Sequence, residues 1–256
     1  MNRIDQLFQT KEKNILSVYF TAGFPNLEDT VPTIQALEAQ GVDMIEVGIP
    51  FSDPMADGPT IQQSGTIALR NGMSLKKLFG QLKEVRQSVR IPLIMMGYLN
   101  PVMQYGIENF CRDCAQAGID GMIIPDLPFA DYLSQVKPVA GRYGLHCIML
   151  ITPETSEERV RQIDEHTSGF IYMVSTASTT GAKDSFDEKT VDYFQRINAM
   201  NLRNPRMIGF GISNKLTFEA ACGNAAGAII GSAFIRSLSE NGDVKTAVEK
   251  LIEKLK

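Results

Sequence analysis

Three carboxyl groups crowd one short segment of the sequence. The segment IEVGIPFSDPMADGPTIQ carries Glu46, Asp53 and Asp57. Side chains alternate along a strand, so Glu46 shares a face with Met44 and Gly48, while the apolar residues between them face the other way. A carboxyl group in such apolar surroundings has a raised pKa, which suits it to transfer a proton near neutral pH. We therefore expect Glu46 to act in proton transfer, with a structural glutamate bonded to nearby backbone as the alternative.

The two aspartates lie in segments typical of turns. Asp53 precedes Pro54, and Asp57 precedes a Gly-Pro pair. Aspartate often accepts a hydrogen bond from its own backbone in such turns, so either residue fits a purely structural role. Spacing alone leaves open which aspartate reaches the same site as Glu46.

Three glycine-containing segments follow expected strands and could bind an anion. They are TTGAK (179–183), GFGIS (209–213) and GSA (231–233). Glycine lets an anion approach the backbone N–H groups, and a helix N-terminus adds a favourable dipole. Loops after the last two strands of β/α barrels commonly bind phosphate, so we expect a phosphate site here. The expected contacts are Gly181, Gly211, Gly231 and Ser232.

The segment STASTTGAKDSFDE, residues 175–188, is long and consists mostly of small and polar residues. Small residues accommodate the backbone changes of a loop that closes over substrate and excludes water. The segment therefore predicts a lid, and a merely flexible loop is the alternative.

Other reactive side chains are poorly placed for chemistry. His146 starts an expected strand and His166 follows a charged helix, so we expect neither in a catalytic triad or a metal site. Cys111 and Cys114 form a CxxC in the middle of an expected helix, which favours ordinary packing over a zinc or redox site. Lysine is absent from every expected strand, so the chemistry is expected to rest on carboxyl groups.

Short apolar segments alternate with amphipathic ones along the chain. The expected strands are ILSVYFTAG, DMIEVGIP, PLIMMGY, GMIIPDL, HCIMLI, GFIYMVS, RMIGFGI and AAGAIIGSA. The expected helices are DTVPTIQALEAQ, SLKKLFGQLKEVRQSV, ENFCRDCAQAG, YLSQVKPVAGRYG, SEERVRQIDEH, TVDYFQRINAM, KLTFEAACG and DVKTAVEKLIEKLK. This alternation and a length of 256 residues predict an α/β fold, a single (β/α)8 TIM barrel of the phosphate-binding type spanning residues 1–256. An open, doubly wound sheet is the alternative.

The composition limits which classes of partner and which cellular compartment are expected. A net charge of -4 argues against a nucleic acid or an anionic membrane surface as partner. The N-terminus lacks a secretory signal, and apolar runs stay well short of the ~20 residues that span a bilayer. Four cysteines are too few for a disulfide scaffold and fit a reducing compartment, so we expect a cytoplasmic protein.

These motifs resemble those of the tryptophan synthase α chain family. The resemblance runs through IEVGIPFSDPMADGPTIQ, YFTAGFP, GYLNP, PDLP, TTGAK, GFGIS and GSA, and covers nearly the whole chain. It implies cleavage of indole-3-glycerol phosphate to indole and glyceraldehyde 3-phosphate. It also implies that Glu46 acts as acid and base, and that Asp57 stabilises the indole N–H as positive charge develops. The implied substrate contacts are Tyr172, Phe210, Thr180, Ile61 and Tyr19.

The resemblance also implies a protein partner. This would be a β subunit that carries pyridoxal phosphate and converts indole and serine to tryptophan, in an α2β2 assembly. The chain itself would need no cofactor and no metal. The implied interface residues are Asp53, Pro54, Asn100 and Pro101. The family's lid usually reads Arg-x-Gly-Val-Thr-Gly, and this sequence departs from it with TASTTG at residues 176–181.

Three other functions fit part of the pattern. A free-standing lyase that releases indole without a partner would use the same carboxyl groups. A sugar-phosphate isomerase would use the phosphate loops but has no evident use for SDPMADGP. A non-catalytic subunit that binds a partner is compatible with the fold, although the pairing of Glu46 with Asp57 argues against it.

Overall fold

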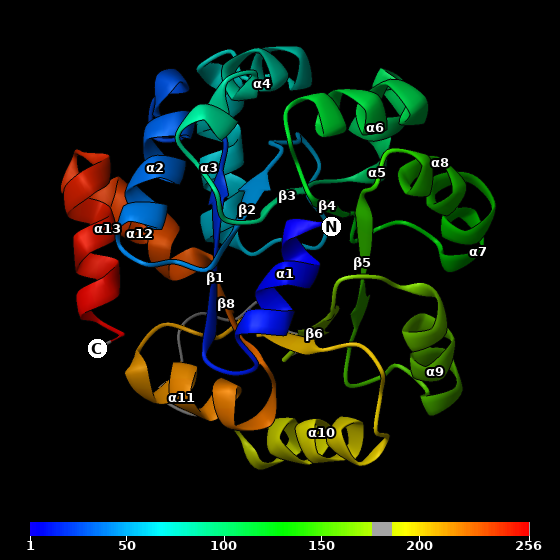
Figure 1. Cartoon of the computed structure of the whole chain (residues 1–256). Coiled ribbons are helices and arrows are strands. Elements are labelled where there is room, and N and C mark those ends of the chain that lie inside the picture. The colour runs from blue at the N-terminus through cyan, green and yellow to red at the C-terminus, as the bar shows by residue number, and fades with distance from the viewer. Residues whose placement is uncertain (176–185, 256) are drawn as a thin grey trace.

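The strands of the computed structural model, which describes residues 1–175 and 186–255, close into a barrel (Figure 1). They are parallel and pair in chain order, and the last strand pairs with the first, where Val18 lies opposite Ile230. The strands are β1 (Ile15–Thr21), β2 (Met44–Gly48), β3 (Leu93–Met96), β4 (Gly121–Ile123), β5 (His146–Ile151), β6 (Ile171–Val174), β7 (Arg206–Gly209) and β8 (Gly227–Ile230). The predicted (β/α)8 barrel is confirmed, and the open sheet is excluded.

Both faces of the strands are buried, which explains their nearly continuous apolar runs. On β2, Ile45 and Val47 pack in the cluster between strands and helices, whereas Met44 packs with Ile94 inside the barrel. Glu46 alternates with Ile45 and Val47 and has 0% of its surface exposed. The predicted inward direction of Glu46 is therefore confirmed.

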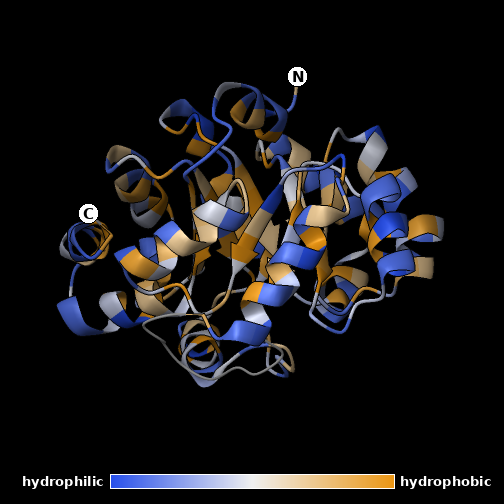
Figure 2. Cartoon of the chain, turned by 90° about the horizontal axis from the view of Figure 1, so that it is seen from below, coloured by the Kyte–Doolittle hydropathy of each residue, from blue (hydrophilic) through white to orange (hydrophobic). Residues whose placement is uncertain are grey.

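Helices surround the barrel and turn their apolar faces toward it, as the hydropathy colours show (Figure 2). They are α1 (Arg3–Thr10), α2 (Thr30–Ala39), α3 (Pro59–Arg70), α4 (Leu75–Leu82), α5 (Leu99–Tyr105), α6 (Ile107–Gln116), α7 (Phe129–Asp131), α8 (Lys137–Arg142), α9 (Glu157–His166), α10 (Glu188–Ala199), α11 (Lys215–Asn224), α12 (Ser232–Asn241) and α13 (Val244–Glu253). Side-chain oxygens of Ser74, Ser156 and Asp243 cap the first turns of α4, α9 and α13. Within the described ranges, none of these helices has the length and apolarity needed to cross a membrane.

The helices differ from the expected ones in two ways. Helices α1, α3, α5, α7 and α12 fall outside the predicted segments, and the helix predicted over 74–89 is divided into α4 and a 3-10 turn at 85–87. Within that turn, Arg86 donates hydrogen bonds to the carbonyl of Gly118 and to the carboxylate of Asp120. These long-range contacts fix the turn, and local periodicity carries no sign of them.

Helix α1 covers the N-terminal end of the barrel, where Figure 1 shows it in front of the strands. Ile4 is fully buried there, and the Phe8 ring lies 6.0 Å from the Phe170 ring. Arg3 forms a 2.9 Å ion pair with the buried Asp120. Because this end of the barrel is closed, a ligand must enter at the C-terminal ends of the strands.

Cys111 and Cys114 lie within α6 and are buried, free thiols. Burial raises the pKa of Cys111 to about 11 and that of Cys114 well above its ordinary value, so both remain protonated and unreactive. Among the residues that the structure describes, no cluster of His, Cys, Asp and Glu side chains could hold a metal ion. The CxxC pair therefore packs in the core, as its mid-helix position predicts.

Candidate active site

Glu46 is the one inward-facing carboxyl group of β2. The Ser17 hydroxyl on β1 donates a 3.1 Å hydrogen bond to Oε1 of Glu46, while Oε2 is buried and has no partner among the described residues. Burial raises the pKa of Glu46 to about 8, and the hydrogen bond from Ser17 opposes that rise. Glu46 therefore carries a proton at neutral pH, and its free oxygen is available to a ligand.

Asp57 lies in the loop between β2 and α3, and the hydroxyl of Tyr98 holds it. Tyr98 follows β3 and donates a 2.9 Å hydrogen bond to Oδ2 of Asp57, while its oxygen accepts one of 2.9 Å from the Ala56 backbone. Burial raises the pKa of Asp57 to about 6, against the lowering effect of the Tyr98 hydrogen bond. At neutral pH, Asp57 is therefore mostly ionised while Glu46 is mostly protonated.

Asp53 occupies a different environment from Asp57. It is exposed, and its carboxylate accepts a hydrogen bond from the neighbouring Ser52 hydroxyl. Asp57 is held by Tyr98, and its charge and that of Glu46 both act on Tyr172, whereas the carboxylate of Asp53 bonds its own exposed loop. Sequence reasoning singled out neither Ser17 nor Tyr98. Ser17 could have been found from the alternation of side chains along β1, which directs Ser17 to the barrel interior.

Two tyrosines lean over glycines of the neighbouring strands. Tyr19 lies opposite Glu46 in the register of β1 and β2, and a methyl group at Gly48 would lie 2.3 Å from the Tyr19 hydroxyl. In the same way, a methyl group at Gly209 would lie 2.1 Å from the hydroxyl of Tyr172. Any larger residue at these two positions would collide with a ring. The absence of a side chain at these two glycines thus leaves space for both rings, which line the barrel mouth.

The two rings share their surroundings with the carboxyl groups. Burial raises the pKa of Tyr172, and the charges of Glu46 and Asp57 raise it further. The Phe210 ring packs edge-on at 6.3 Å from the Tyr172 ring. Phe210 has a left-handed backbone (φ 69°), and its carbonyl accepts a 2.7 Å hydrogen bond from the Ser175 hydroxyl. These aromatic side chains give the site a flat apolar wall beside its acids.

Those of the remaining predicted contacts that fall within the described residues lie at the same end of the barrel. Ile61 is half-buried in the first turn of α3, and Gly211 follows β7 with a left-handed backbone (φ 74°). Gly231 and Ser232 begin α12 directly after β8. Thr180, Gly181 and most of the predicted lid lie outside the described residues.

The four predicted interface residues come from the loop between β2 and α3 and from the start of α5, which follows the short loop after β3. Asp53 and Pro54 lie between β2 and α3, and Asn100 and Pro101 lie in the first turn of α5. The rings of Phe51 and Tyr98 pack 5.4 Å apart, and the Tyr98 hydrogen bonds tie these loops together. Two exposed methionines that the sequence analysis did not single out flank this surface, Met55 at 93% exposure and Met103 at 57%.

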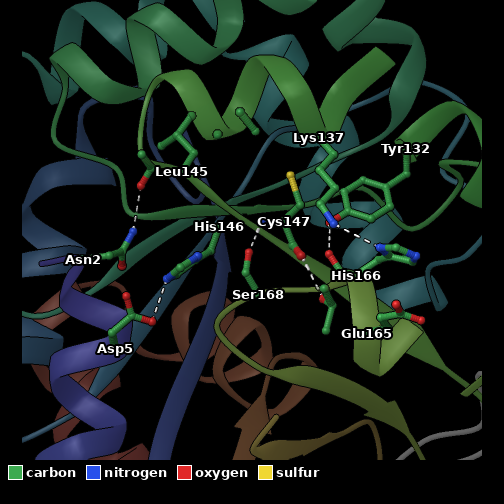
Figure 3. A pocket seen from close by; sticks show the side chains of 14 residues that line it. Asn2, Asp5, Tyr132, Lys137, Leu145, His146, Cys147, Glu165, His166 and Ser168 are labelled. Atoms are coloured by element: carbon green, nitrogen blue, oxygen red, sulfur yellow. Dashed lines mark hydrogen bonds and ion pairs between the residues drawn. The ribbon is translucent and has the colours of Figure 1, made fainter. Parts of the chain in front are cut away.

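Both histidines lie at the closed end of the barrel (Figure 3). His146 starts β5 and pairs with Asp5 of α1 at 2.8 Å, and His166 ends α9 with its Nδ1 atom 3.2 Å from Lys137 Nζ. They line a pocket of about 500 Å³ between α1, α8 and α9. This pocket is separated from Glu46 by the packed barrel interior, so it is not the carboxyl site.

Comparisons with known proteins agree with this geometry. The family model described as tryptophan synthase alpha chain matches residues 5–256. A tryptophan synthase alpha chain of Parabacteroides distasonis is 65% identical over 256 residues, covering 100% of both chains. One from Bacteroides thetaiotaomicron is 64% identical over 256 residues, again covering 100% of both.

Solved structures give the same result. The crystal structure of tryptophan synthase subunit alpha from Legionella pneumophila is similar with a TM-score of 0.88 and 35% identity, covering 100% of this chain and 97% of that one. A tryptophan synthase complex from Pyrococcus furiosus contains a chain with a TM-score of 0.85 and 32% identity, covering 96% of this chain and 98% of that one. The protein described here belongs to the tryptophan synthase alpha chain family.

Proposed function

We propose that this chain cleaves indole-3-glycerol phosphate to indole and glyceraldehyde 3-phosphate, as the α subunit of tryptophan synthase. The observation that carries the proposal is the pair of carboxyl groups with separated pKa values, about 8 for Glu46 and about 6 for Asp57. Two neighbouring acids whose surroundings separate their pKa values are suited to opposite tasks at one pH. Between pH 6 and pH 8 this site offers one proton donor and one anion.

Glu46 acts first as the acid and then as the base. Its proton is transferred to the ring carbon that bears the side chain, which leaves the ring positively charged. The resulting carboxylate then accepts the proton of the adjacent side-chain hydroxyl while the carbon–carbon bond breaks. The bonding electrons return to the ring, so indole and an aldehyde leave and Glu46 ends protonated. The free Oε2 atom is the one available for both transfers.

Asp57 stabilises the charge that develops between these two proton transfers. The positive charge of the protonated ring is shared by the ring N–H, which a carboxylate can bind as a hydrogen-bond acceptor. Tyr98 orients that carboxylate before the substrate arrives. We assign the flat wall around the ring to Tyr172, Phe210, Ile61 and Tyr19.

We assign the phosphate group of the substrate to the ends of β7 and β8. Gly211, Gly231 and Ser232 present backbone and hydroxyl groups there, and the N-terminus of α12 adds a favourable dipole. Thr180 and Gly181 are assigned to the lid over the substrate by the family resemblance alone. The reaction consists of proton transfers between carboxyl groups and substrate, so we propose that this chain uses no cofactor of its own.

The partner is proposed to be the β subunit, which holds pyridoxal phosphate, in an α2β2 assembly. The surface that contains Asp53, Pro54, Asn100 and Pro101 is the proposed interface, and the exposed Met55 beside it supports that placement. We propose further that residues 1–256 form one domain, since β1 and β8 pair directly. The four buried free thiols support a reducing compartment such as the cytoplasm.

Indole release by the purified chain tests this function. We expect slow release from indole-3-glycerol phosphate by the chain alone and faster release when a cognate β subunit is added in excess. Fast release at a rate that does not change when the β subunit is added would instead indicate a free-standing lyase. An absence of release in both mixtures would overturn the proposed reaction and redirect attention to other phosphate-bearing substrates.

A further inference from the structure

The Tyr19 side chain lies between the acids and the expected phosphate site. Its backbone pairs with that of Glu46, and its hydroxyl lies over Gly48, one step closer to the barrel mouth than Glu46. On the opposite side, the ring atom Cδ1 lies 3.5 Å from the position that a methyl group at Gly231 would take. Tyr19 thus reaches from the carboxyl groups to the end of β8.

The hydroxyl of Tyr19 is a neutral donor over the whole working range of the acids. Burial raises the pKa of this phenol well above its ordinary value, the charge of Asp57 raises it further, and a side-chain hydrogen bond with Thr21 opposes the rise. Tyr19 therefore keeps its proton at every pH at which Glu46 and Asp57 titrate. A phenylalanine would supply the same flat apolar wall, so the hydroxyl contributes only through its polar partners. Because the Thr21 bond lowers the pKa, the Tyr19 oxygen accepts it, and the proton of Tyr19 is left for a second polar group.

A bound substrate brings such a group to this place. With its ring against Tyr172 and Phe210 and its phosphate at Gly231, the three-carbon arm between them must pass alongside Tyr19. We propose that the Tyr19 hydroxyl donates a hydrogen bond to the hydroxyl on the middle carbon of that arm. Tyr19 then selects for a hydroxylated arm in addition to lining the ring pocket. This inference rests on the proposed reaction.

The experiment compares two ligands in the native chain and in the Tyr19→Phe variant. Indole-3-glycerol phosphate has the arm hydroxyls, and indole-3-propyl phosphate lacks them. We expect Tyr19→Phe to lower kcat/KM for indole-3-glycerol phosphate roughly 10-fold to 100-fold, the range for loss of a buried hydrogen bond. The Kd of indole-3-propyl phosphate, measured by calorimetry, should change less than 2-fold.

Two outcomes would overturn the inference. An unchanged kcat/KM would show that the hydroxyl makes no contact with the substrate, and an equal loss for both ligands would show that it only supports the shape of the pocket. Tyr132→Phe is the matched control, because it removes a hydroxyl that bonds the His166 carbonyl at the closed end of the barrel. Failure of the proposed reaction is distinguishable, since the native chain would then release no indole at all.

Discussion

The Ser17 hydroxyl donates a 3.1 Å hydrogen bond to one oxygen of Glu46 and leaves the other oxygen without a partner among the described residues. This one-sided arrangement fixes the carboxyl group and keeps one oxygen available. A hydrogen bond that favours the charged form lowers the pKa, so Ser17 limits how far burial raises that of Glu46. Ser17 therefore adjusts the pH at which the acid loses its proton.

Replacement of Ser17 by alanine should move the alkaline limb of the pH profile to higher pH. The active form needs protonated Glu46, and without the Ser17 hydrogen bond its pKa rises above the present value of about 8. We expect a shift of roughly one pH unit in kcat/KM for indole release. Thr33→Val is the control, since it removes a buried hydroxyl in α2. A limb that stays in place would show that Ser17 does not tune the acid.

Replacement of Glu46 by glutamine should abolish indole release and make the fold more stable at alkaline pH. The folded-state pKa of about 8 lies above the ordinary value of 4.5, so the folded chain holds this proton more tightly than the unfolded chain. Stability from this group is therefore complete below about pH 4.5 and is lost as pH rises through 8.

The neutral amide avoids that loss, and the expected gain above pH 8 is on the order of 5 kcal/mol. Urea unfolding at pH 5, 7 and 9 measures it. The exposed Glu240→Gln change serves as the control and should leave the pH dependence as in the native chain. A glutamine variant with the native pH dependence would contradict the raised pKa.

Replacement of Tyr98 by phenylalanine should change the pKa of Asp57. The lost hydrogen bond raises the pKa of Asp57 above its present value of about 6, so the acidic limb of kcat/KM moves to higher pH. The loop also loses the contact with the Ala56 backbone, and we expect kcat to fall roughly 10-fold. Tyr105→Phe removes a similar tyrosine–aspartate hydrogen bond, to Asp113 outside the site, and should leave both quantities unchanged. An acidic limb at its native position in Tyr98→Phe would argue against this role.

These residues also show how far the sequence alone could predict the site. The inward direction of Glu46 follows from the alternation of side chains along a strand, which is a local property. The barrel follows from the alternation of strand and helix segments along the chain and from the chain length. The role of Tyr98 depends on a contact 41 positions away along the chain, and no local pattern encodes such a pairing. The same is true of Asp57 against Asp53, because turn chemistry is alike at both and only the position of β3 distinguishes them.

Introduction of a charge at Met55 should weaken binding of the β subunit while leaving the barrel folded. Met55 is 93% exposed in the loop that carries Asp53 and Pro54, so a new aspartate there is solvated in the free chain and would lose that solvation at the proposed interface. We expect Met55→Asp to raise the Kd for the β subunit at least 10-fold by calorimetry, and to reduce the partner's acceleration of indole release. Leu216→Asp is the matched control, because this 66% exposed leucine lies on α11 at the opposite side of the barrel. Equal weakening by both variants would indicate a general effect of charge, and native affinity in Met55→Asp would place the interface elsewhere.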